Sequence, residues 1–155
     1  MIEPEARSVV IEREVAYPPE KIWRALTQPH LIAEWLMQND FAPVAGHRFT
    51  LRRTPRPDIS VVIDCEVVEI EVNRTLSYTW AAYGLDSVVT WTLTPTATGT
   101  VLRMEHSGFG PDQQQAFAGA KAGWRQFFAG LDRVLAQPDL GDASDLSDMT
   151  ARRPS

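Results

Sequence analysis

The sequence predicts one α+β domain, in which a curved antiparallel sheet of about six strands wraps around a long C-terminal helix. Two observations predict it. Residues 46–107 alternate in hydrophobicity with a period of two between turns, which is typical of consecutive antiparallel strands. Residues 112–136 change to a helical period and carry one continuous apolar stripe. No internal repeat and no second domain are evident.

The N-terminal elements come first. Residues 9–16 form the first predicted strand, because apolar side chains share one face and glutamates the other. Two short helices follow, over 20–26 and 30–35, and each places its large apolar residues on one side. Pro19 fits the first turn of the first helix, where its missing N–H needs no partner.

Five more strands are expected, over 46–53, 59–72, 75–82, 87–94 and 100–107. Residues 55–58 and 95–99 have the proline, glycine and threonine content of turns. Within 59–72 the apolar positions change from odd to even numbers at Val67 and Val68. Such a change of face indicates a β-bulge or a strong bend.

The long helix is interrupted by three glycines, at Gly119, Gly123 and Gly130. Each weakens the helix by about 1 kcal/mol relative to alanine, so each calls for a packing reason. A glycine in a helix permits a close approach of the backbone or leaves room for another group.

The domain is expected to span 8–136, and the polar segment 137–155 is expected to be a flexible tail.

Composition excludes several classes of function. The net charge is −5 and the pI is about 5.2, whereas a nucleic-acid surface needs a clustered basic stripe. The richest basic run, 52–56, is short and reads as a solvated loop. No segment resembles a signal peptide or reaches the length of a membrane span, so a cytoplasmic location and no membrane partner are expected.

Metal and cofactor sites are not expected. The three histidines, His30, His47 and His106, are far apart in sequence, and the single cysteine, Cys65, cannot supply a zinc cluster. No glycine-rich phosphate loop or dinucleotide-binding fingerprint occurs. Cys65 also excludes an intramolecular disulfide, and a small buried side chain is the better interpretation of it than a nucleophile.

Many large side chains are expected to face the interior of the domain. Ten of them form the predicted ligand-binding set: Trp35, Phe41, Phe49, Tyr78, Trp80, Trp91, Met104, His106, Trp124 and Phe128. A sheet bent around one helix does not close on itself, so these side chains either line a pocket for a small hydrophobic ligand or fill the space themselves. Both interpretations stay open.

His106 is the most informative titratable residue. It shares a strand face with Leu102 and Met104, so its ring is expected to point inward and to stay neutral. It is the one candidate for a catalytic base or a ligand hydrogen bond. The sequence favours the alternative, a core histidine with both ring nitrogens satisfied. Asp64 and Glu66 are expected to face solvent.

Several phrases of the chain resemble one known superfamily. They occupy residues 18–27, 29–35, 76–80, 99–109 and 123–124. In this order they resemble the START-like (SRPBCC) superfamily, and within it the activator-of-heat-shock-ATPase-like family. The resemblance covers roughly residues 8–136 and implies the helix-grip fold. Residues 53–59 depart from it, because they lack the glycine-rich hairpin common in the family.

The resemblance implies no single function, since one fold hosts many sites. The first hypothesis is a non-catalytic binding protein for a small apolar or aromatic molecule. The second is a cyclase, dehydratase or hydrolase-type enzyme that uses the same pocket, with His106 acting beside Tyr78 or a carboxylate. The third is a chaperone-partner module; a homodimer is a further possibility.

Overall fold

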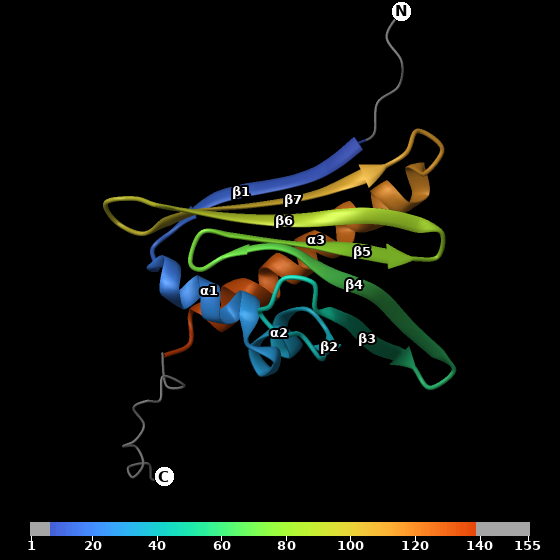
Figure 1. Cartoon of the computed structure of the whole chain (residues 1–155), viewed down its shortest axis with the longest axis horizontal. Coiled ribbons are helices and arrows are strands. Elements are labelled where there is room, and N and C mark those ends of the chain that lie inside the picture. Colours follow the sequence, from blue (N-terminus) through green and yellow to red (C-terminus); the bar gives the residue numbers. More distant parts are fainter. Residues whose placement is uncertain (1–6, 139–155) are drawn as a thin grey trace, which may run out of the picture.

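The computed structural model describes residues 7–138. Its strands form one antiparallel sheet in the order β1-β7-β6-β5-β4-β3-β2 (Figure 1). The strands are β1 (Arg7–Val15), β2 (Gln38–Asn39), β3 (Arg48–Arg56), β4 (Ile59–Glu71), β5 (Thr75–Ala82), β6 (Leu85–Pro95) and β7 (Thr100–Phe109). The helices are α1 (Pro19–Thr27), α2 (Pro29–Trp35) and α3 (Gln114–Leu135).

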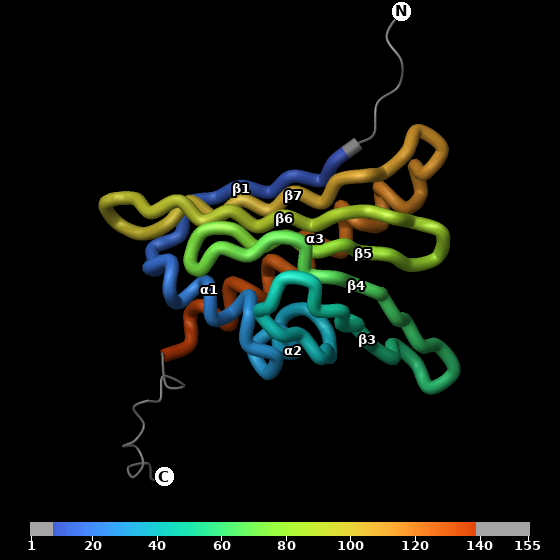
Figure 2. The backbone as a smooth tube through the Cα atoms, viewed as in Figure 1, coloured from blue at the N-terminus to red at the C-terminus, as the bar shows by residue number. Residues whose placement is uncertain are grey.

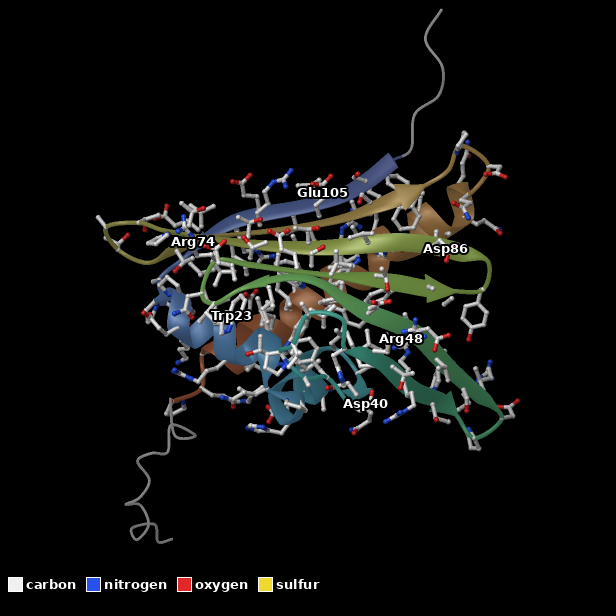
Figure 3. All side chains as sticks on the ribbon, viewed as in Figure 1. Trp23, Asp40, Arg48, Arg74, Asp86 and Glu105 are labelled. Carbon is white, nitrogen blue, oxygen red and sulfur yellow. The ribbon has the colours of Figure 1, made fainter. Side chains whose placement is uncertain are left out.

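The long helix α3 crosses one face of the sheet diagonally, and α1 and α2 lie against its C-terminal half (Figures 1 and 2). The opposite face of the sheet carries mainly polar side chains, with a few exposed valines such as Val10 and Val62. There Ser77 and Thr90 contact each other at 3.2 Å between their hydroxyl oxygens, and Arg103 pairs with Glu105 at 3.1 Å. Figure 3 shows Glu105 on this outer face. The predicted α+β helix-grip fold is therefore confirmed.

Irregularities in two strands have local causes. In β4 the register with β5 shifts between Val67 and Glu69, so Val68 bulges outward, which confirms the predicted change of face. The predicted turn at 55–58 is too long, because β3 continues through Arg56. A register shift between Arg53 and Arg56 accommodates Pro55, which has no N–H to give to a neighbouring strand.

One strand was not predicted. The two residues of β2, Gln38 and Asn39, pair with Arg52 and Leu51 and extend the sheet beyond β3. A strand of two residues has no period to recognise, so the sequence predicts six strands where the structure has seven. The side chain of Asn39 also donates to the carbonyls of Met37 and of Pro29, the first residue of α2, which ties β2 to the start of that helix.

The core lies between the sheet and the C-terminal half of α3. Trp91 on β6 is its centre: the ring lies edge-on to Trp35 at 5.6 Å between centroids and stacks on Phe128 at 5.7 Å. The Trp35 indole N–H donates to the Ala25 carbonyl at 2.8 Å, which joins α2 to α1. Gly130 of α3 lies so close to Trp35 that an added Cβ would meet its backbone at 3.3 Å. This glycine permits α2 and α3 to pack.

Beyond the domain, the predicted flexible tail 137–155 lies outside the described residues except for Gln137 and Pro138. Within residues 7–138, no helix has both the length and the apolar character needed to cross a membrane.

Candidate functional site

A cavity of about 240 Å³ lies between the N-terminal half of α3 and the sheet. It is at the end of the sheet where β6 begins and β7 ends, the end marked by Asp86 in Figure 3. The sheet and the segments beside it supply Met37, Arg53, Val61, Trp80, Leu85, His106 and Phe109. The helix supplies Ala116, Gly119, Ala120, Gly123, Trp124 and Phe127.

Small residues on α3 make the room. Ala116, Gly119, Ala120 and Gly123 follow the spacing i, i+3, i+4, i+7, so they share one face of the helix. A Cβ added to Gly119 would meet nothing within 4 Å, and one added to Gly123 would meet only the Phe127 ring at 3.8 Å. The cavity therefore exists because these four positions of the helix carry no side chain beyond Cβ.

A directed chain of hydrogen bonds forms the back of the cavity. The Trp124 indole N–H donates to His106 Nδ1 at 2.9 Å, and His106 Nε2 lies 2.8 Å from Ser87 Oγ. Ser87 Oγ donates in turn to the Trp80 carbonyl at 2.7 Å. An indole N–H is a donor only, so Nδ1 must accept and the ring proton must lie on Nε2. The position of each proton in this series of hydrogen bonds is thereby assigned.

This polarity decides what His106 can do. A serine nucleophile needs a histidine nitrogen that accepts its proton, but here Nε2 donates and the Ser87 proton is held by a carbonyl. Burial lowers the pKa of His106 to about 4, which keeps the ring neutral. His106 is thus a buried histidine with both ring nitrogens partnered, as the sequence favours.

The ten predicted binding residues are all buried, but they divide into two groups. Trp80, His106 and Trp124 line the cavity. The other seven do not line it and pack in the core: Trp35, Phe41, Phe49, Tyr78, Trp91, Met104 and Phe128. Their rings fill space, for example Phe49 against Tyr78 at 5.5 Å between centroids. Their predicted binding role stays a prediction.

Sequence reasoning missed most of the cavity wall. The predicted elements place Arg53 at the end of a strand, Leu85 and Phe109 between elements, and Ala116 and Ala120 within the long helix, with no indication of a cavity. One signal was present. The two glycines at 119 and 123 share a helix face with two alanines, a run of four small residues opposite a sheet rich in tryptophan.

The remaining reactive groups lie elsewhere. Burial raises the pKa of the Cys65 thiol to about 12, and its Sγ contacts the Ile63 carbonyl at 3.8 Å. Asp64 faces solvent as expected, and the partly exposed Glu66 lies 3.7 Å from the Arg48 guanidinium. Among residues 7–138, no three histidine, cysteine or acidic side chains cluster as metal ligands.

A family model matches most of the chain. The model described as Activator of Hsp90 ATPase homolog 1-like protein aligns with residues 16–136, which include every element from α1 to α3. Among curated proteins there is no match to the chain.

Solved structures share the fold. Protein MLL2253 from Mesorhizobium loti is 58% identical, with a TM-score of 0.79 over 86% of this chain and 100% of that one. CalU16 from Micromonospora echinospora is 24% identical, with a TM-score of 0.71 over 84% of this chain and 77% of that one. DynU16, from the dynemicin biosynthetic locus, is 27% identical, with a TM-score of 0.70. That match covers 83% of this chain but only 46% of DynU16.

Proposed function

The chain belongs to the Activator of Hsp90 ATPase homolog 1-like family of the START-like (SRPBCC) superfamily. For this member of the family, we propose that it binds a small apolar or aromatic molecule without catalysing its conversion. The ligand occupies the cavity between α3 and the sheet, and Trp80, Trp124 and Phe127 form its aromatic wall.

The observation that carries the proposal is the run of small residues on α3. A helix that packs on a sheet stabilises the fold by burying large side chains, as Trp124 and Phe128 do. Four small residues on the same helix forgo that burial, and Gly119 also weakens the helix by about 1 kcal/mol. A ligand that fills the cavity buries the apolar surface that these small residues leave uncovered. Ligand binding therefore explains why small residues occur at four helix positions where larger ones would pack better.

The enzyme alternative needs His106 as a base. Its Nδ1 accepts from Trp124 and its Nε2 donates to Ser87, so neither nitrogen is available to take a proton from a substrate. This polarity supports binding over a cyclase, dehydratase or hydrolase activity. The chaperone-partner alternative has no observation among the described residues that favours it.

A neutral fluorescent probe, N-phenyl-1-naphthylamine, tests the proposal. We expect it to bind, to brighten and to quench tryptophan emission, because Trp80 and Trp124 line the cavity. Gly119→Leu places a side chain in the cavity and should weaken binding by roughly tenfold or more. Ala118→Leu is the matched control, since Ala118 is exposed like Gly119 but does not line the cavity. Absence of binding, or equal binding by Gly119→Leu, would refute the proposal.

A further inference from the structure

We propose that the ligand is an organic acid, with an apolar ring-containing body and one anionic group, and that Arg53 binds this group at the rim of the cavity. The inference rests on the proposed function and adds the chemical class of the ligand. Two independent observations carry it: an arginine without a carboxylate partner and an indole N–H without an acceptor, both in the lining of one cavity.

Arg53 points to the cavity side of the sheet. On β3 it continues the row of Phe49 and Leu51, whose side chains are buried in the grip, and it pairs across the sheet with Val61. Arg53 and Val61 both line the cavity. The neighbouring Arg52 belongs to the opposite face of β3. Its guanidinium donates to Thr50 Oγ1 at 2.7 Å and lies near Asp40, whose pKa is lowered chiefly by a hydrogen bond from the Thr50 N–H.

Charge makes Arg53 exceptional in the lining. The cavity is lined by no aspartate or glutamate, and Arg53 is its one ionised side chain, because burial holds the pKa of His106 at about 4. Within residues 7–138, Arg53 forms no ion pair with a carboxylate. Arg53 is exposed, and the exposed Arg56 and Arg125 also form no ion pair with a carboxylate among these residues, so what distinguishes Arg53 is its place in the lining of the cavity.

The second observation concerns Trp80. Its side chain is only 8% exposed, yet its indole N–H has no acceptor among the described residues. Trp35, Trp91 and Trp124 donate to Ala25 O, Tyr78 Oη and His106 Nδ1. Trp23, which is also 8% exposed, likewise has no acceptor among the described residues, but it lies outside the cavity lining. A buried donor is normally paired, so the unpaired Trp80 N–H in the cavity wall is available to an acceptor on the ligand. An organic acid supplies both acceptor oxygens for Trp80 and the negative charge that would pair with Arg53.

The experiment is a displacement assay. N-phenyl-1-naphthylamine is bound first, and 2-naphthoic acid or the neutral 2-naphthamide then competes for the site at neutral pH. These competitors have the same ring system and differ in charge. We expect the acid to displace the probe roughly three- to fivefold more effectively than the amide, as befits an ion pair at a partly exposed rim. Arg53→Gln should remove this preference, whereas Arg52→Gln, the matched control on the other face, should keep it.

The outcomes separate this inference from the function on which it rests. If the neutral probe does not bind, the proposed function fails and the ligand class fails with it. If the probe binds but acid and amide compete equally, the function stands and the ligand class is wrong. The ligand class is also wrong if Arg52→Gln removes the preference as fully as Arg53→Gln, because the effect then belongs to general surface charge.

Discussion

The buried His106 makes the stability of the protein depend on pH in a predictable way. In the unfolded chain the imidazole has its ordinary pKa of about 6.5, whereas burial in the folded protein lowers the pKa to about 4. Between these values the unfolded chain binds a proton that the folded protein does not. The contribution of His106 to the free energy of unfolding therefore decreases as the pH falls below about 6.5 and levels off near pH 4.

The two pKa values set the size of the effect. Their difference corresponds to about 3 kcal/mol, of which about 2 to 3 kcal/mol is lost between pH 7 and pH 4.5. The structure explains why the folded ring resists the proton. A proton added to Nδ1 would face the Trp124 indole N–H, now 2.9 Å away, and the ring is surrounded by Phe109, Trp80 and Trp124 instead of carboxylates.

Urea unfolding of the wild type and of His106→Gln at both pH values measures this loss. Glutamine keeps a donor and an acceptor but does not titrate, and every other ionisable group is common to both proteins. We expect the wild type to lose about 2 to 3 kcal/mol more than the variant on going to the lower pH. Equal losses in the two proteins would show that His106 is not held neutral by the fold, and the assigned hydrogen-bond chain would be wrong.

Two other predictions follow from local geometry. Gly99→Ala should lower the free energy of unfolding by about 2 kcal/mol or more, because a Cβ there would lie 2.0 Å from the Val15 carbonyl oxygen. Gly119→Ala should instead raise it by up to about 1 kcal/mol, because alanine favours the helix and its Cβ would meet nothing within 4 Å. Urea unfolding of the two variants measures both changes. Cys65 should react slowly with a disulfide reagent at pH 8 in the native state and rapidly in urea, because burial raises its pKa to about 12; rapid native reaction would contradict the buried position.

Most of the fold could be predicted because its strands and helices show a regular spacing of apolar residues along the sequence. The strand 75–82 matches β5, and the change of face at Val67 and Val68 correctly placed a bulge. The errors occur where no period exists. The strand β2 has two residues, and β3 passes through Pro55 only because a register shift there leaves no ladder partner for the missing N–H.

The cavity was harder to predict for a different reason. Counting large aromatic residues identifies what fills an interior, and seven of the ten predicted residues do fill it. An empty space is instead determined by small residues, and by which turn of the helix faces which strand. That depends on the tertiary arrangement, so Arg53 and Leu85 could not be assigned to the wall from the sequence.

Glycines have opposite roles at the two ends of α3, so that one half of the helix packs closely and the other half borders the cavity. Near the C-terminal end Gly130 lets the backbone of α3 approach Trp35, where an added Cβ would come within 3.3 Å. Near the N-terminal end Gly119 faces open space. Between these ends Trp124 and Phe128 are buried, and at the N-terminal end Phe117 packs on Phe109 at 5.6 Å between ring centroids. Because the packed half supplies the buried area that stabilises the fold, the wall at the other half can change with little loss of stability. Changes at the small residues of the wall, Ala116, Gly119, Ala120 and Gly123, are therefore expected to alter what the cavity binds more than whether the chain folds.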